Sequence, residues 1–102
     1  MTVLAEWLQH HITRAPSALK ERVREYALQS ERDAAQLSGI LGAAGHRALD
    51  QVLAHAGDRS VALDLLAADA LITLALLAQA QQAPEGLDEF AVTILRASRP
   101  DA

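Results

Sequence analysis

The stretch from Val61 to Ala83 places the strongest constraint on what this chain can fold into. Drawn as a helix at about 100° per residue, it carries leucines and Ile72 on almost every side. A helix that is apolar on all sides is normally enclosed by other helices. The sequence therefore predicts a central helix at about residues 59–83, surrounded by the rest of the chain.

The composition of this stretch argues against a membrane span. A spanning helix needs about 20 mostly apolar residues, and a charged residue near its centre costs about 2.5 to 3.5 kcal/mol. The stretch contains Asp64 and Asp69, and the uncharged run that remains, from Ala70 to Pro84, is shorter and includes three glutamines. We therefore expect a soluble protein with no membrane partner.

The overall composition indicates an all-α fold. The chain has 102 residues, of which 51% are hydrophobic but only 3% aromatic, namely Trp7, Tyr26 and Phe90. The core must therefore consist mainly of leucine and alanine, which favour helices, whereas residues that favour strands are scarce. A chain of this length forms one domain. We predict a single domain over residues 1–102, an all-α, compact bundle of four to six helices.

Cysteine content and charge restrict the compartment and the partners. The sequence has no cysteine, so it can form neither disulfides nor thiolate metal sites, which fits a reducing, cytoplasmic location. No basic flank precedes an apolar run at the amino terminus, as a signal peptide would require. The net charge is −4, and the acidic excess lies in the second half of the chain. Nucleic acid is not expected as a partner, because it is bound by basic surfaces.

Proline marks the clearest helix boundary. Pro16 restricts the residue before it to an extended conformation and is well suited to the start of a helix. It should separate an amphipathic helix over residues 2–13, docked through Trp7, from a second helix that begins at about Ser17. The last helix is expected near residues 85–98, after a turn rich in glutamine, proline and glycine.

Residues 17–43 allow two interpretations. Their apolar positions stay in phase throughout, and no glycine or proline interrupts them before Gly39, which favours one continuous helix. Alternatively, Ser30 to Asp33 has the pattern of a capping box, which would start a second helix at Ser30. In both interpretations the charged side chains of this segment, including Arg22, should point to solvent.

Three glycines, Gly39, Gly42 and Gly45, follow at a spacing of three. They lack the Gly-Lys-Ser/Thr sequence of a phosphate-binding loop, and no strand precedes them as in dinucleotide-binding folds. We interpret them as the end of a helix in which small residues allow close packing. A separate short helix should follow at residues 47–56, ended by Gly57.

Asp69 is the strongest candidate for a functional residue. On a helix it lies between Leu65, Leu66, Ile72 and Leu76, on the side that we expect to be buried. A buried carboxylate is costly unless it is paired or hydrogen-bonded. Asp69 could be paired with a cation from another helix or from a second chain, or it could contact a ligand inside the bundle.

The other ionisable residues form no recognisable site. Asp64 shares its side of the central helix with alanines, which predicts a solvated acid in the first turn. Two histidines lie four residues from a carboxylate, as His10 does from Glu6, but a di-metal site in a bundle needs Glu-x-x-His spacing on paired helices. That spacing is absent from the sequence. We predict no catalytic residue, no metal and no cofactor.

One segment of the central helix resembles part of a known family. Residues 66–75 read Leu-Ala-Ala-Asp-Ala-Leu-Ile-Thr-Leu-Ala. This is similar to a helix of trans-isoprenyl diphosphate synthases that contains an alanine-glycine-aspartate-alanine-leucine-leucine pattern. The resemblance implies a much larger all-helical domain with two aspartate-rich motifs for metal and diphosphate. This chain has neither motif, so no activity follows from the resemblance.

Two classes of function are consistent with these features. The first is a non-enzymatic protein-interaction module that forms a homodimer, since a second copy would complete the enclosure of the central helix and two-fold dimers are the commonest oligomers. The partner in this class could also be another protein. The alternative is a small-molecule site, enzymatic or not, in the bundle interior. Its candidate ligand-binding residues are Asp69, Thr73, Trp7 and Tyr26.

Overall fold

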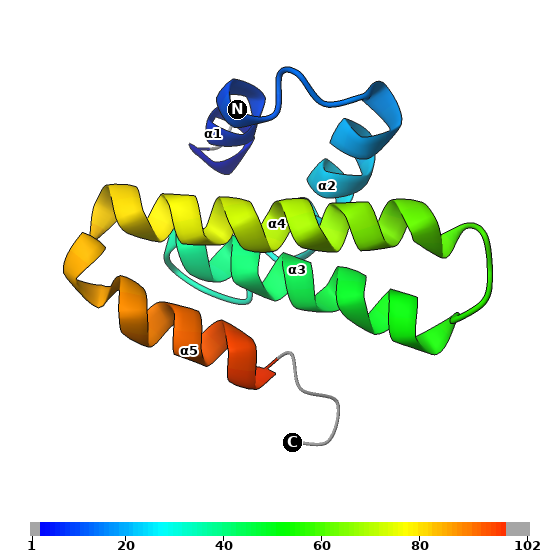
Figure 1. Cartoon of the computed structure of the whole chain (residues 1–102). Helices are drawn as coiled ribbons and strands as arrows, with labels where there is room; N and C mark the ends of the chain where they lie inside the picture. The colour runs from blue at the N-terminus through cyan, green and yellow to red at the C-terminus, as the bar shows by residue number, and fades with distance from the viewer. Residues whose placement is uncertain (1–2, 98–102) are drawn as a thin grey trace.

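The computed structural model describes residues 3–97 of the chain. These residues form five α-helices and one short 3₁₀ helix (Figure 1), and no strand occurs among them. The elements in chain order are α1 (Val3–His11), α2 (Ser17–Gln29), α3 (Leu37–Ala54), α4 (Val61–Gln82), η1 (Pro84–Gly86) and α5 (Leu87–Ala97). The prediction of an all-α bundle of four to six helices is confirmed.

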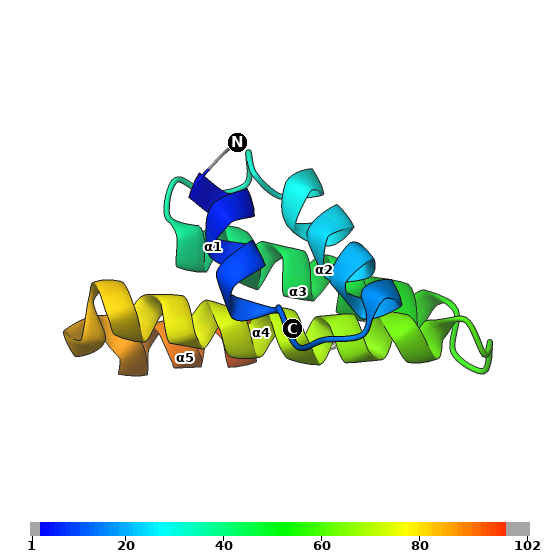
Figure 2. The same cartoon turned by 90° about the horizontal axis from the view of Figure 1, so that it is seen from above.

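α4 is the central helix, as the sequence predicts. It contacts α2, α3 and α5. In Figure 1, α1 and α2 lie on one side of α4, and α5 lies on the opposite side. Seen from above, α3 runs beside α4, with α1 and α2 lying over the pair (Figure 2). The helix begins at Val61 and ends at Gln82, close to the predicted bounds of 59–83.

The core consists mainly of leucine and alanine, in agreement with the composition. Leu8, Leu41 and Leu71 are among the largest fully buried side chains. α1 docks through its leucines and Ile12, whereas Trp7, the predicted anchor, is only partly buried. The buried alanines of α3 and α4 are Ala44, Ala48, Ala67, Ala68, Ala75 and Ala78.

The preferred prediction of one helix over residues 17–43 is wrong, because α2 ends at Gln29 and α3 begins only at Leu37. The hydroxyl of Ser30 donates a hydrogen bond to the carbonyl oxygen of Tyr26 at 2.9 Å. Ser30 therefore closes α2. The capping-box interpretation places the break correctly but gives Ser30 the opposite role.

The turn between α2 and α3 is stabilised by polar contacts rather than by glycine or proline. The backbone N–H of Asp33 donates to the carbonyl oxygen of Ser30 at 2.9 Å. Arg47 of α3 donates two hydrogen bonds to Oδ2 of Asp33, from Nη2 at 2.9 Å and from Nε at 3.2 Å. These contacts replace the turn residues that sequence analysis looked for.

The three glycines lie inside α3, so the predicted helix end there and the separate helix at residues 47–56 are both wrong. The predicted close packing is confirmed at Gly45, where an added Cβ atom would lie 2.8 Å from Cγ1 of Ile72 in α4. At Gly42 an added Cβ atom would lie 3.9 Å from its nearest neighbour, in α5, which is an ordinary contact distance. Gly45 therefore sets the close approach of α3 and α4.

The chain leaves α3 through a short loop at residues 55–60. Gly57 has a φ of 94°, in the left-handed region that glycine adopts without strain. Oδ1 of Asp58 accepts a hydrogen bond from the backbone N–H of Ser60 at 3.1 Å, and this hydrogen bond lowers the pKa of Asp58. The loop reverses the chain direction, so α3 and α4 form an antiparallel helical hairpin (Figure 1).

By length and composition alone, α4 is the one helix in residues 3–97 that could cross a membrane. In this fold it is the element on which the other helices pack. Its first turn also contains a buried carboxylate, Asp64, that is paired with α2. This compact arrangement suggests a soluble protein.

Candidate functional site

The two aspartates of α4 occupy environments opposite to those the sequence predicts. Asp64 is buried, with 7% of its surface exposed, whereas Asp69 is exposed to solvent. α4 turns its alanine-rich side toward the bundle, because small side chains let helices approach closely, and it leaves much of its leucine-rich side outside. The predictions of a buried Asp69 and a solvated Asp64 are therefore wrong.

Asp64 is held by two residues of α2 that lie one helical turn apart. Its Oδ1 atom accepts a hydrogen bond from the hydroxyl of Tyr26 at 2.8 Å and forms an ion pair with Nη1 of Arg22. The hydrogen bond to Asp64 raises the pKa of Arg22. Because a buried carboxylate is tolerated only when it is paired, this cluster is a structural link between α2 and the start of α4.

Tyr26 should titrate at unusually high pH. Burial raises the pKa of Tyr26 to about 12, and its hydrogen bond to Asp64 acts in the same direction. The folded protein thus holds this proton more tightly than the unfolded chain. The stability contributed by Tyr26 should therefore be complete below about pH 10 and be lost as the pH rises toward about 12.

Tyr26 is the only tyrosine, so the ultraviolet absorbance of tyrosinate measures this titration directly. We expect a midpoint near 12 for the folded protein, against the ordinary value of 10.0. The Tyr26→Phe variant is the control, since its stability should lack this pH dependence. A midpoint at the ordinary value in the folded protein would show that the phenol is not held by Asp64.

Sequence analysis missed Arg22 and Asp64 as partners. The usable signal was the spacing of Arg22 and Tyr26, which lie four residues apart and so share one side of α2. Arg22 is also less solvated than predicted, with 35% of its side chain exposed. Nothing in the sequence indicates that Asp64, which is 42 residues away, lies opposite this pair.

α4 has one side that no other helix in the described part of the chain covers, and this side faces the viewer in Figure 1. Leu65 and Leu66 on α4 are 53% and 56% exposed, and Leu77 is 40% exposed. These residues share one helix face by their spacing. We call this surface the outer face, and it consists of Ala62, Leu65, Leu66, Asp69, Thr73 and Leu77. Asp69 is its only charged residue.

The four residues of the predicted interior site do not come together. Asp69 and Thr73 lie one turn apart on the outer face, and both are exposed. Tyr26 is buried beside Asp64 at the start of α4. Trp7 lies near the other end of α4. The interior location expected for Asp69 and Thr73 is therefore wrong.

Trp7 fastens α1 to the carboxyl-terminal end of α4. Its Nε1–H donates a hydrogen bond to Oε1 of Gln81 at 3.2 Å. Its ring stacks on that of His11, with the ring centroids 4.0 Å apart. Nδ1 of His11 in turn donates to the carbonyl oxygen of Trp7 at 2.8 Å. These contacts satisfy the N–H of Trp7 and hold its ring in place, so the position of this side chain requires no bound ligand.

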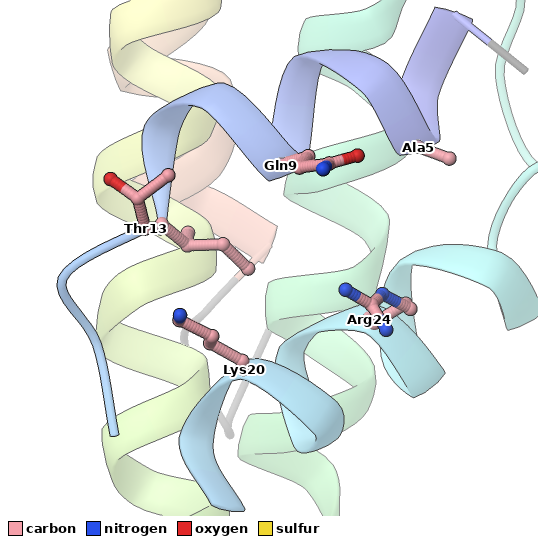
Figure 3. A pocket seen from close by; sticks show the side chains of 6 residues that line it. Ala5, Gln9, Thr13, Lys20 and Arg24 are labelled. Atoms are coloured by element: carbon pink, nitrogen blue, oxygen red, sulfur yellow. The ribbon is translucent and has the colours of Figure 1, made fainter. Parts of the chain in front are cut away.

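An open cleft of about 630 Å³ lies between α1 and α2 (Figure 3). It is lined by Ala5, Gln9, Ile12, Thr13, Lys20 and Arg24. The two cations, Lys20 and Arg24, face the α1 side of the cleft, and this positive lining suits a small anion. Arg24 is exposed and Lys20 is only partly buried, so neither is held in place for a ligand. The outer face is therefore the stronger candidate site.

Comparison of the chain with models of known protein families found no match, and neither the curated proteins nor the solved structures compared with it gave a significant match. The short resemblance of residues 66–75 to isoprenyl diphosphate synthases is thus not supported by a family match. Function has to be argued from the surfaces described above.

Proposed function

We propose that this protein is a non-enzymatic interaction module that forms a homodimer through the outer face of α4. The observation that carries the proposal is the exposure of Leu65, Leu66 and Leu77 on the central helix. Monomeric proteins rarely expose contiguous apolar patches larger than a few hundred Å², and patches of that size commonly mark interaction sites. A helix that packs on its alanine side and presents leucines to water is suited to a second packing partner.

A second copy fits this face better than a membrane does. Helices that lie on membranes carry lysine and arginine beside their apolar face, which attract anionic lipids. The outer face has no basic residue, its one charge is the acid Asp69, and the chain has a net charge of −4. An isologous contact requires only that one patch match itself, and a straight apolar helix face does so readily.

The environments of the two carboxylates of α4 support the non-enzymatic part of the proposal. The carboxylate of Asp64 is engaged by Arg22 and Tyr26, and that of Asp69 is exposed on a convex helix surface. Enzyme sites are usually concave and contain groups whose pKa values are shifted toward their task. A cytoplasmic location remains our prediction from the absence of cysteine.

Sedimentation equilibrium tests the homodimer, with Leu66→Lys as the disrupting variant. The wild-type mass should rise with concentration toward twice the chain mass of 10.9 kDa, and Leu66→Lys should stay at 10.9 kDa. Because Leu66 is already 56% exposed, the lysine should leave the fold of the single chain intact, which circular dichroism will check.

Leu53→Lys is the matched control. Leu53 is 54% exposed, almost as much as Leu66, but it lies on α3 and outside the outer face. This variant should dimerise like the wild type. Equal loss in both variants would indicate a general effect of added charge, and a wild type that stays at the chain mass throughout would overturn the homodimer. Binding of the monomer to lipid vesicles, lost in Leu66→Lys, would assign the outer face to a membrane instead.

A further inference from the structure

We infer that the cleft between α1 and α2 binds a small organic phosphate, whose phosphate group is held by Lys20 and Arg24. The volume of the cleft, about 630 Å³, lies within the range of small-molecule sites. None of the six residues that line it belongs to the outer face of α4. The inference therefore goes beyond the proposed homodimer and does not depend on it.

The cleft has the opposite charge to the chain as a whole. The described residues that line it include two cations and no carboxylate, whereas the net charge of the chain is −4. The acids next to these cations in sequence, Glu21 and Glu25, do not line the cleft, and Glu25 lies 3.8 Å from Nε of Arg22 instead. A cleft lined by charges of one sign raises the local concentration of counter-ions. An anion should therefore collect here on an otherwise acidic protein.

The two cations are placed to share one phosphate group. Lys20 and Arg24 lie one turn apart on α2, at a spacing that puts Cβ atoms about 5 to 6 Å from each other. Both side chains extend from α2 toward α1 (Figure 3). Arg24 can donate two parallel hydrogen bonds to phosphate oxygens, and Lys20 adds a compact positive charge. A phosphate monoester carries about −1.5 to −2 charges at neutral pH, which matches the two cations.

The remainder of the cleft suits an organic group attached to the phosphate. Ala5 and the largely buried Ile12 provide apolar surface on the wall formed by α1 and the turn after it. The hydrocarbon stems of the two cations add to this surface, because such side chains keep only their heads in water. Gln9 and Thr13, on the same wall, can both donate and accept hydrogen bonds. This lining favours a phosphate with a small apolar or aromatic group over a bare phosphate ion.

The exposure of the cations predicts weak, salt-sensitive binding. Arg24 is exposed and Lys20 is partly buried, so both side chains lose conformational freedom when they close on a ligand. A charge pair at an exposed site contributes at most about a factor of five in affinity. We therefore expect a dissociation constant roughly in the millimolar range, which rises with salt concentration.

Phenyl phosphate is a suitable probe, and the amide chemical shifts of ¹⁵N-labelled protein show where it binds. Its addition should shift the amides of residues 5–13 and 20–24 until they saturate. Lys20→Gln and Arg24→Gln should each raise the dissociation constant about threefold to fivefold, and the double variant should raise it about tenfold or more. Arg59→Gln is the matched control, because it removes the same charge from an exposed position in the loop at residues 55–60. It should leave the dissociation constant unchanged.

Inorganic phosphate and phenol test the two parts of the ligand separately. Each should bind more weakly than phenyl phosphate, because each lacks one of the two groups that the cleft accommodates. Inorganic phosphate that binds as tightly as phenyl phosphate would indicate an adventitious ion only, and phenol that does so would show that the cations play no part. Either result would overturn the inference.

Three further results would also contradict the inference. The first is the absence of a saturable shift at millimolar phenyl phosphate. The second is a set of shifted amides that excludes α1 and α2. The third is an equal loss of binding in Arg59→Gln and Arg24→Gln, which would show a general effect of net charge. Circular dichroism of each variant confirms that its fold is retained before its affinity is compared.

Discussion

The Asp64→Ala variant should be less stable than the wild type by about 3 kcal/mol, a substantial part of the 5 to 15 kcal/mol typical of a domain. The substitution leaves the buried hydroxyl of Tyr26 without its acceptor, which alone costs about 1 to 3 kcal/mol. It also leaves Arg22 with only its longer ion pair to Glu25, at 3.8 Å. That part of the loss is moderated, because 35% of the Arg22 side chain is exposed and can hydrate. Urea unfolding followed by circular dichroism measures the difference.

Asp69→Ala provides the matched control on the same helix. Its carboxylate is exposed and has no partner within residues 3–97, so its removal should change the free energy of unfolding by no more than about 0.5 kcal/mol. Both variants should be measured at protein concentrations low enough to keep the chain monomeric. A loss at Asp69 as large as that at Asp64 would contradict the orientation of α4.

Gly45→Leu should also be strongly destabilising, by about 3 kcal/mol. Even an added Cβ atom would lie 2.8 Å from Cγ1 of Ile72, which belongs to a branched side chain close to its own backbone and cannot easily move away. A leucine must therefore push α3 and α4 apart, and overpacking of this kind costs about 1 to 3 kcal/mol or more. Thermal unfolding of the variant measures the loss.

Gly42→Ala, one turn earlier in α3, should have the opposite sign. Its Cβ atom would meet its nearest neighbours at 3.9 and 4.0 Å, so it fits without displacement. Replacing glycine by alanine inside a helix is worth roughly 0.5 to 1 kcal/mol, and we expect a gain of that order. If both glycines tolerated substitution equally, the close approach of the two helices at Gly45 would be wrong.

The fold class and the positions of most helices were predictable because they depend on local features. Leucine and alanine favour helices wherever they occur, and Pro16 acts on the residue directly before it. The break between α2 and α3 was not predictable in the same way. At this break Ser30 closes α2 by bonding to Tyr26, and Arg47 reaches back to Asp33 from the next helix, whereas sequence analysis had looked only for glycine or proline.

The orientation of α4 was not predictable, because the residue pattern of a helix that is apolar on every side does not indicate which side will be buried. Sequence analysis assumed that the side with the larger residues, around Asp69, would be buried. The bundle instead buries the alanine side, where α3 can come close at Gly45. Which side of α4 is buried depends on how well its surface fits the surfaces of the helices that pack on it. The sequence of one helix alone does not contain that information.

The antiparallel hairpin of α3 and α4 has a consequence for the order of folding. These two helices make the most extensive contact in the structure, and only residues 55–60 separate them in sequence. Contacts between close neighbours in sequence close small loops and form quickly, whereas those of Asp64 with α2 and of Gln81 with Trp7 must close much longer ones. The hairpin should therefore form first, with α3 already packed against α4 at Gly45, while the leucine side of α4 and the side that α2 and α1 cover are still open to solvent. The arrival of α2 and α1 then protects one side, and the other stays exposed for as long as the chain remains alone.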